Sequence, residues 1–125
     1  KEGAAFLEAN AKREGVTVLD NGLQYEVLQE GTGKTPTQTD TIVAHYRGTL
    51  IDGKQFDSSY DRGEPFEARV TGVIRGWTEA LLRMKEGAKW KLYIPYDLAY
   101  GARGAGPDIP PYSTLIFEME LLEVK

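Results

Sequence analysis

One helical pattern lies in the middle of a chain whose other segments alternate like β-strands. Within residues 73–84 the apolar residues recur at the spacing i, i+3, i+4 and i+7, which places them on one face of a helix: Trp77, Ala80, Leu81 and Met84. A single short helix is not stable by itself in water. The pattern therefore predicts that a sheet wraps around this helix.

The segments on both sides of the helix alternate between apolar and polar residues with a period of two, which is typical of half-buried strands. They span residues 16–19, 23–27, 41–50, 55–57, 66–70, 89–94 and 115–121. Asp52-Gly53 is a strong hairpin signal, and Pro95 ends one strand because proline cannot donate a ladder hydrogen bond. Together these signals predict an α+β domain in which an antiparallel sheet of about five strands curls over one short helix.

The first residues have the composition of a separate helix. Residues 1–14 carry only a narrow apolar stripe, so the domain is expected to bury this helix poorly, and Gly15 suits a C-terminal stop. Two interpretations are open: a frayed surface helix, or the end of a longer helix whose upstream part was removed. The start at Lys1 rather than Met indicates a trimmed or processed product. We expect two parts, the end of a linker helix at 1–15 and a folded domain at 16–125.

Charge and composition weigh against several classes of function. The net charge of −4, without any basic run, argues against a nucleic-acid partner. The absence of cysteine excludes disulfides and thiolate chemistry. The single histidine, His45, lies within a predicted strand without a second histidine at metal-ligand spacing, so we interpret it as structural and expect no metal site. Asp57 and Asp61 fit turn capping better than the carboxylate pair of a glycosidase.

The unusual feature is a set of aromatic and aliphatic residues at strand ends and loop edges. Taken singly, each of them fits a core position. Their placement beside loops rich in glycine and proline, such as residues 99–112, favours a concave apolar pocket for a small ligand. The set comprises Tyr46, Phe56, Phe66, Val73, Ile74, Trp77, Tyr100, Ile109 and Phe117.

Five motifs in this order resemble the FK506-binding class of peptidyl-prolyl cis-trans isomerases. They are VAHYRG at 43–48, GKQFDSS at 53–59, GVIRGW at 72–77, LAYG at 98–101 and IPP at 109–111. The resemblance runs from about Gly22 to Val124. The segment at 6–16 is similar to the stretch that joins the dimerising helical region to the catalytic domain in bacterial macrophage-infectivity-potentiator-like members. This similarity favours the linker-helix interpretation of the N-terminal residues.

The resemblance implies a role for each pocket residue. Trp77 forms the floor, and the expected catalytic set is Asp57, Tyr100, Phe117, Trp77 and Tyr46. Asp57 is the polar element of the wall, and the Tyr100 hydroxyl donates to a substrate carbonyl. The backbone N–H groups of Ile74 and Ile109 are expected as further donors. The substrate-binding or ligand-binding set is Phe56, Arg62, Phe66, Val73, Ile74 and Ile109.

The implied activity is rotation of X-Pro peptide bonds in protein folding, without a cofactor or metal. Resonance opposes this rotation by roughly 18–20 kcal/mol and is lost in the twisted transition state, so a dry aromatic pocket disfavours the planar amide. A differential stabilisation of about 4 kcal/mol corresponds to about 10³-fold acceleration. The alternative is a non-catalytic binding module or holdase chaperone that uses the same pocket for proline-containing segments.

The resemblance also implies partners and a location. Proline-containing polypeptides are the expected substrates, macrolides such as FK506 or rapamycin the expected inhibitors, and a homodimer through upstream residues the expected assembly. The location implied is the bacterial cell envelope, periplasm or outer membrane, with the cytoplasm as the alternative. Gly72 stands where an acidic residue is common, and the loop tip at 105–108 is small and acidic. These departures leave the preference for the residue before proline and the macrolide affinity open.

Overall fold

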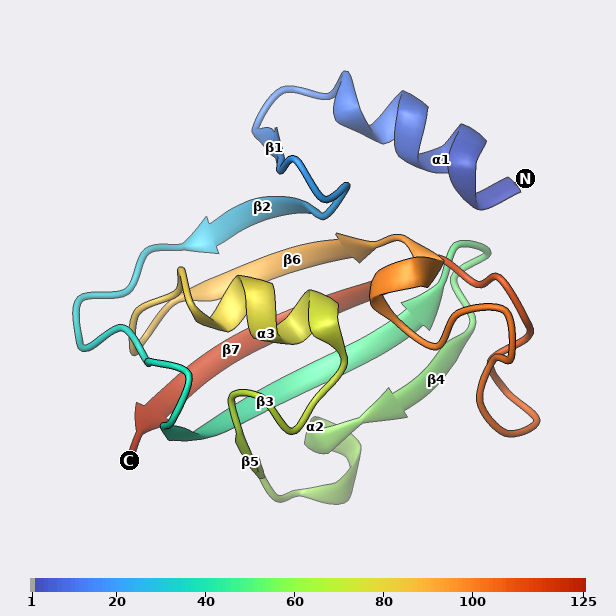
Figure 1. Ribbon diagram of the computed structural model, residues 1–125. Coiled ribbons are helices and arrows are strands. Elements are labelled where there is room, and N and C mark those ends of the chain that lie inside the picture. Colours follow the sequence, from blue (N-terminus) through green and yellow to red (C-terminus); the bar gives the residue numbers. More distant parts are fainter. Residues whose placement is uncertain (1) are drawn as a thin grey trace.

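The computed structural model describes residues 2–125 as a twisted antiparallel sheet that wraps around one short helix (Figure 1). The elements are α1 (Glu2–Ala11), β1 (Val16–Val18), β2 (Gln24–Gln29), β3 (Thr41–Leu50), β4 (Gln55–Ser58), α2 (Ser59–Arg62), β5 (Phe66–Arg69), α3 (Arg75–Leu81), β6 (Lys89–Ile94), the 3-10 helix η1 (Tyr96–Leu98) and β7 (Leu115–Val124). The strand order is β1-β2-β6-β7-β3-β4, and β5 also pairs with β3. The predicted α+β fold with one central helix is confirmed.

The sheet has seven strands, and each predicted strand segment contributes one of them. The total exceeds the expected number of about five because β4 and β5 are separate short strands on the same edge of β3. β4 pairs with β3 near Arg47, and β5 pairs with it near Ala44. The other edge of β3 pairs with β7 along nearly its whole length. β3 is therefore the strand with the most partners in the sheet, since it pairs with β4, β5 and β7.

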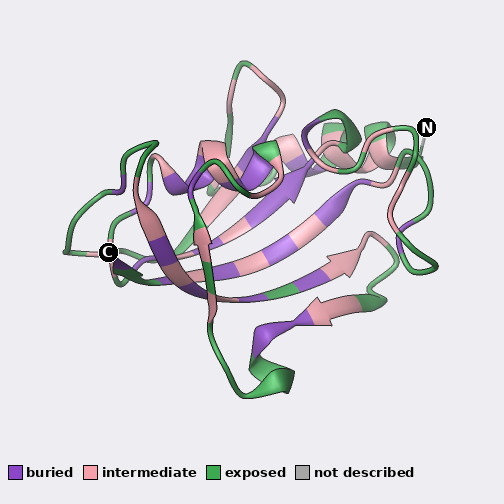
Figure 2. Cartoon of the chain, turned by 60° about the horizontal axis from the view of Figure 1, so that its bottom comes forward, coloured by how far each residue is buried: buried purple, intermediate pink, exposed green. Residues whose placement is uncertain are grey.

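The core lies between α3 and the concave face of the sheet. Alternating residues of β3 and β7 are buried, as the period-two pattern predicts (Figure 2). α3 begins at Arg75 and ends at Leu81, so it is shorter than residues 73–84, and the following residues up to Met84 continue as a turn. The predicted helix face is nevertheless buried in full: Trp77, Ala80, Leu81 and Met84.

A glycine allows α3 to lie close against β6. A Cβ atom on Gly76 would meet Cγ2 of Ile94 at 2.6 Å, which is closer than carbon atoms can approach. The small residue therefore lets the first turn of α3 approach the sheet, and this approach places Trp77 under the strands. The close packing of α3 against β6 therefore depends on the absence of a side chain at Gly76.

As expected, the domain buries little of α1: Asn10 is its only buried residue, and the helix is attached to the domain mainly by polar contacts. Asn10 is only 5% exposed, and its Nδ2 donates to Oε1 of Gln24 at 2.8 Å. Gln24 in turn donates to the carbonyl oxygen of Leu7 at 2.9 Å. Just beyond the helix, Arg13 donates to the Tyr93 hydroxyl on β6 at 2.8 Å. The apolar stripe of α1 is narrow, so mainly hydrogen bonds rather than apolar packing attach the helix to the sheet. Lys1, which is also predicted to belong to this helix, lies outside the described residues.

Candidate active site

A pocket of about 430 Å³ opens where α3, the β4–α2 segment and the loop after β6 come together. Nine of the eleven residues predicted for the site line it, and Gly72 is an additional lining residue. The nine are Tyr46, Phe56, Asp57, Phe66, Val73, Ile74, Trp77, Tyr100 and Phe117. The strands and the helix thus bring together side chains that lie far apart in the sequence.

Trp77 forms the floor of this pocket. The residue is 4% exposed, and three aromatic rings stand nearly perpendicular to its indole ring. The ring centroids lie 4.9 Å from Tyr46, 5.2 Å from Phe117 and 5.9 Å from Phe66. These edge-to-face pairs are a favoured aromatic geometry, so they hold the rings at fixed angles. The result is a rigid, largely apolar cup.

Close packing also fixes the wall formed by Phe56 and Phe117. The two rings are perpendicular, with centroids 5.5 Å apart, and both lie against the backbone of Gly48. A Cβ atom on Gly48 would meet Cζ of Phe56 at 2.6 Å and Cε1 of Phe117 at 2.8 Å. The two rings can therefore pack in this way only because Gly48 has no side chain.

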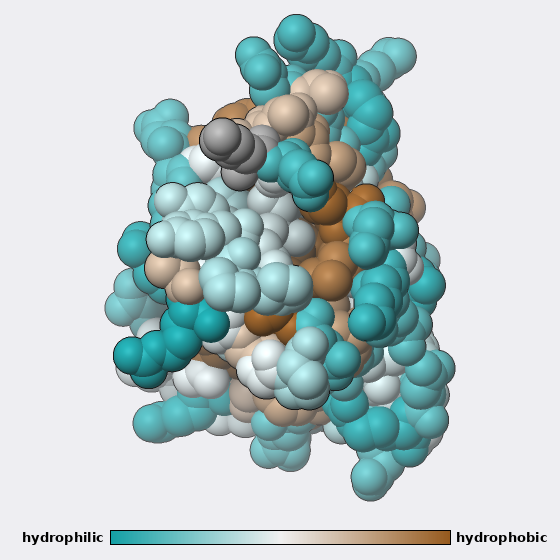
Figure 3. Space-filling model, turned by 90° about the vertical axis from the view of Figure 1, so that its right-hand side faces the viewer, coloured by the Kyte–Doolittle hydropathy of each residue, from teal (hydrophilic) through white to brown (hydrophobic). Residues whose placement is uncertain are grey.

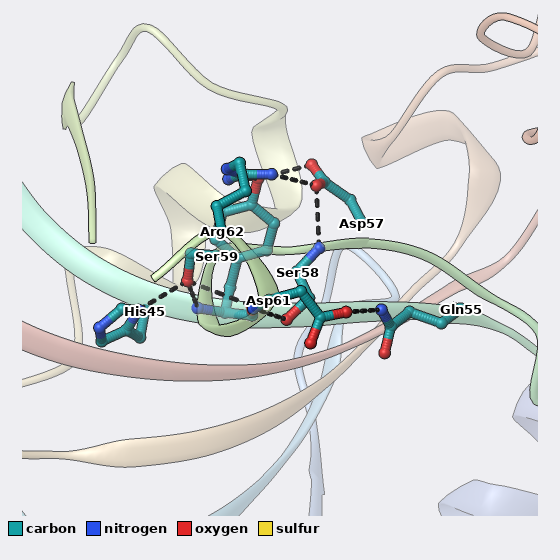
Figure 4. Close-up of polar contacts among 8 residues, drawn as sticks. His45, Gln55, Asp57, Ser58, Ser59, Asp61 and Arg62 are labelled. Atoms are coloured by element: carbon teal, nitrogen blue, oxygen red, sulfur yellow. Dashed lines mark hydrogen bonds and ion pairs between the residues drawn. The ribbon is translucent and has the colours of Figure 1, made fainter. Parts of the chain in front are cut away.

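One polar cluster interrupts the aromatic surface, and it consists of Tyr46, Asp57 and Arg62. The Tyr46 hydroxyl donates to Oδ2 of Asp57 at 2.5 Å, and Nη2 of Arg62 donates to the same hydroxyl at 2.9 Å. Nη1 of Arg62 forms an ion pair with Oδ1 of Asp57, which also accepts the N–H of Ser58 (Figure 4). Each oxygen of the carboxylate therefore has at least one donor.

The electrostatics of the cluster keep its protonation states fixed at neutral pH. Burial raises the pKa of Asp57, but the hydrogen bonds from Tyr46 and Arg62 and the charge of Arg62 outweigh it, so the pKa lies below its ordinary value. Burial and the neighbouring Asp57 raise the pKa of Tyr46. Asp57 is thus a carboxylate, and Tyr46 remains a neutral donor.

Three donor groups at the pocket have no hydrogen-bond partner in the described residues, and a ligand could accept from them. The Tyr100 hydroxyl makes no hydrogen bond within residues 2–125, and burial together with the charge of Asp57 raises its pKa, so it stays protonated. The N–H of Ile74, the residue before α3, likewise has no partner in the described part of the chain. The Trp77 Nε1–H is buried without a partner among the same residues.

Arg62 and Ile109 are not among the lining residues. Arg62 lies outside the pocket lining and contacts two lining residues, Asp57 and Tyr46. Ile109 is buried in the core, and its N–H donates to the carbonyl oxygen of Ala105 at 3.1 Å. The expectation that this N–H serves a ligand is therefore not met in this structure, because a tight bridge across the loop tip already uses it.

Gly72, which stands where an acidic residue is common in the family that the sequence resembles, has no side chain, so it can line the pocket only through its backbone and Cα. The sequence patterns missed one feature of the site. Ser59 is completely buried behind the polar cluster and binds His45 and the backbone of Tyr46. A serine after Asp57-Ser58 carries no periodicity, so only its position against β3 reveals it. The structural interpretation of His45 agrees with this contact.

A second hollow of about 360 Å³ lies between the start of α1 and the turn after β3. It is bordered by Glu2, Leu50, Ile51 and residues 110–114, and it lacks the aromatic floor of the first pocket. The side of the molecule that carries the start of α1 shows apolar surface only as a narrow strip flanked by hydrophilic residues (Figure 3). The aromatic pocket is therefore the stronger candidate for a binding site.

Within residues 2–125, no group of three or more His, Cys, Asp or Glu side chains is arranged to hold a metal ion. None of the helices in the same residues has the length and apolar character needed to cross a membrane.

Two family models match the chain. One, described as FKBP-type peptidyl-prolyl cis-trans isomerase, matches residues 32–122. The other, described as the domain amino terminal to FKBP-type peptidyl-prolyl isomerase, matches residues 1–27. The first match contains all of the pocket residues described above.

Individual proteins and solved structures agree with these models. The chain is 58% identical over 123 residues to the FKBP-type 22 kDa peptidyl-prolyl cis-trans isomerase of Escherichia coli K12, covering 98% of this chain and 60% of that protein. It is 50% identical to the peptidyl-prolyl cis-trans isomerase Mip of Coxiella burnetii, covering all of this chain and 54% of that protein. The crystal structure of FkpA from Escherichia coli superposes with a TM-score of 0.95 at 53% identity, covering 99% of this chain and 58% of that chain. The chain thus spans only about half to 60% of the length of these relatives. It belongs to the family of FKBP-type peptidyl-prolyl cis-trans isomerases.

Proposed function

We propose that this chain catalyses the cis–trans isomerisation of X-Pro peptide bonds in polypeptides. The observation that carries the proposal is a rigid aromatic cup with Trp77 as its floor and a single polar cluster in its wall. A proline ring fits such an apolar cup, and the adjoining peptide bond then lies beside the polar groups. The names of the relatives, which are peptidyl-prolyl cis-trans isomerases, support the same activity.

The physical basis is differential binding of the twisted amide. Rotation about the C–N bond is opposed by roughly 18–20 kcal/mol, because the planar amide is stabilised by resonance. In the twisted transition state this resonance is lost, and the carbonyl is less polar than in the planar form. A pocket that offers apolar walls disfavours the planar amide more than the twisted one. About 4 kcal/mol of such discrimination gives about 10³-fold acceleration.

We assign the roles of the residues as follows. Trp77, Phe66 and Phe117 hold the proline ring, while Phe56 and Val73 form the rest of the apolar wall. The Tyr100 hydroxyl and the Ile74 N–H, which are free to donate, bind the carbonyl groups on either side of the rotating bond. Asp57, held by Tyr46 and Arg62, places a fixed negative charge beside the bond as it twists. Macrolides such as FK506 and rapamycin are expected to compete for the same cup.

The setting of the whole protein is also a proposal. We infer a place in the bacterial cell envelope, since one relative with 48% identity is named outer membrane protein MIP, from Legionella longbeachae. We also infer that α1, which ends at Ala11, is the end of a longer linker helix within a linker segment that runs to about residue 15, and that upstream residues form a homodimer. Cell fractionation and sedimentation of the full-length protein test these two inferences.

The activity is tested by NMR exchange spectroscopy on a short X-Pro peptide. We expect the chain, at a small fraction of the peptide concentration, to accelerate exchange between the cis and trans signals, and we expect FK506 to abolish the effect. Phe117→Tyr brings a hydroxyl into the apolar wall and should slow exchange, whereas Lys12→Gln, at an exposed position just after α1, should not. Binding of the peptide without accelerated exchange would support the non-catalytic binding module instead.

A further inference from the structure

A gap interrupts the strand pairing along one edge of β3. β4 reaches as far as Arg47, which pairs with Ser58, and β5 begins at Ala44, which pairs with Phe66. Neither strand pairs with the two residues in between, His45 and Tyr46. Backbone groups left unpaired in the interior are costly, so something else has to bind them.

The hydroxyl of Ser59 fills this gap. Ser59 is the first residue of α2, and it is completely buried. Its Oγ accepts the backbone N–H of Tyr46 at 2.7 Å and lies 3.3 Å from the carbonyl oxygen of the same residue. The same Oγ lies 2.8 Å from Nδ1 of His45 (Figure 4). One side chain therefore takes the place of a strand partner.

His45 holds this hydroxyl from the outer side of the sheet edge. Its ring stacks on Tyr60 with a centroid distance of 4.6 Å, and the Tyr60 hydroxyl donates to Glu120 on β7. The imidazole is thus fixed in orientation by its neighbours. Two hydrogen-bond arrangements are possible. Either the Ser59 hydroxyl donates to Nδ1 of His45, or a protonated Nδ1 donates to Ser59 Oγ and the hydroxyl donates to the Tyr46 carbonyl oxygen.

The gap lies directly behind the polar cluster of the pocket. α2 has only four residues, and the residue that follows it, Gly63, is in the left-handed conformation. Its first residue, Ser59, binds the backbone of Tyr46, and its last residue, Arg62, binds the hydroxyl of the same tyrosine at 2.9 Å. Tyr46 is therefore held at both ends by one short helix, and a shift of α2 on β3 moves the guanidinium relative to Asp57.

We propose that Ser59 is a positioning residue for the isomerase site. Its buried hydroxyl fixes α2 on β3 and thereby sets the geometry of the cluster of Tyr46, Asp57 and Arg62. The role rests on the proposed function, since it serves a site whose activity is itself proposed. Ser59 does not reach the pocket, so its effect passes entirely through the cluster.

A double-mutant cycle separates positioning from general stability. We expect Ser59→Ala to lower kcat/KM for the X-Pro peptide about tenfold when Arg62 is present. In the Arg62→Ala background the same change should cost less than twofold, because the geometry it controls is already lost. An equal loss in both backgrounds overturns the proposal, since it would show that Ser59 acts on the fold rather than on the cluster.

A spectroscopic measurement reads the geometry without catalysis. Asp57 is faced by Tyr46 from β3, Arg62 from α2 and Tyr100 from the loop after β6. In a ¹³C NMR titration of the Asp57 carboxyl group, Ser59→Ala should raise its pKa, because the donors that lower it move away. An unchanged titration overturns the proposal. If the wild-type chain had no isomerase activity, the proposed function would be refuted. The titration would still show whether Ser59 sets the geometry around Asp57.

His45→Phe provides a second variant in case Ser59→Ala does not fold. It retains an aromatic ring to stack on Tyr60 and removes the nitrogen that holds the Ser59 hydroxyl. The expected result in the same cycle is a smaller loss of kcat/KM, of about threefold, that disappears in the Arg62→Ala background. No loss, or a loss that persists in that background, contradicts the proposal.

Discussion

Tyr46 donates its phenolic proton to Asp57 across 2.5 Å, at the point where the aromatic floor meets the polar wall of the pocket. The two residues come from neighbouring strands, β3 and β4, and Arg62 binds both of them from α2. The contact keeps the carboxylate ionised and in one place, although its side chain is 41% exposed. An otherwise apolar site thus contains a fixed negative charge.

Removal of this carboxylate should affect activity more than stability. We expect Asp57→Ala to lower kcat/KM for an X-Pro peptide about tenfold, while the midpoint of urea unfolding changes little, since exposed ion pairs contribute about 0–1 kcal/mol. Asp61→Ala on α2 is the matched control, because Asp61 is a nearby carboxylate outside the cluster. Equal activity of the Asp57 variant and the wild type would remove Asp57 from the site.

Gly48 should tolerate no side chain. In Gly48→Ala the added methyl group meets Phe56 and Phe117 at distances below 3 Å, so both rings have to move into the pocket. We expect a loss of about 1–3 kcal/mol in the free energy of unfolding, which is typical of overpacking, and a more than tenfold loss of isomerase activity. Urea unfolding and the peptide exchange assay measure the two effects. Wild-type activity in this variant would mean that the Phe56–Phe117 wall is not needed.

The contact of Arg13, just after α1, with the sheet should depend on pH. Hydrogen bonds from Tyr93 and Arg13 lower the pKa of Glu26, against a smaller effect of burial. A lowered pKa in the folded state stabilises the fold above the ordinary value near 4.5, and this contribution is lost as the pH falls through the folded-state pKa. Glu26→Gln should therefore flatten the acid side of the stability curve. Identical curves for both proteins between pH 3 and 6 would contradict this account.

Asn10 should matter far more than an ordinary residue of a surface helix. Asn10→Ala leaves the Oε1 atom of the buried Gln24 without its donor, which costs about 1–3 kcal/mol. Hydrogen exchange should then show faster opening of α1, with little change in β3 and β7. Ala9, which is exposed on the same helix, provides the control as Ala9→Ser. Equal protection of α1 in wild type and Asn10→Ala would show that the helix is held by other contacts.

The sequence predicted the parts of this structure that depend on local patterns. Period-two alternation located every strand, and the 3.6-residue spacing located the helix face with Trp77. The pocket aromatics followed from motifs that resemble a known family. The contacts of α1 and the residues just after it did not follow. Arg13, for example, is 80 residues from Tyr93, and the two meet only through the register of β2 and β6.

Two other features could not be predicted for a similar reason. Ser59 acquires its role from a gap between two strands that only the pairing of β3 reveals. The N–H of Ile109 was expected to face a ligand, but a bridge to Ala105 across the loop tip binds it. Hydrogen bonds between distant segments depend on register and loop conformation, which residue spacing alone does not determine.

The central claim is that the pocket catalyses rotation and does not merely bind proline-containing chains. The most direct test is the refolding of a protein whose slow phase is limited by prolyl isomerisation. At about one-hundredth of the refolding protein's concentration, this chain should increase the rate of that phase in proportion to its own concentration. An unchanged rate, with aggregation suppressed only at equimolar amounts, would contradict catalysis and identify the chain as a holdase.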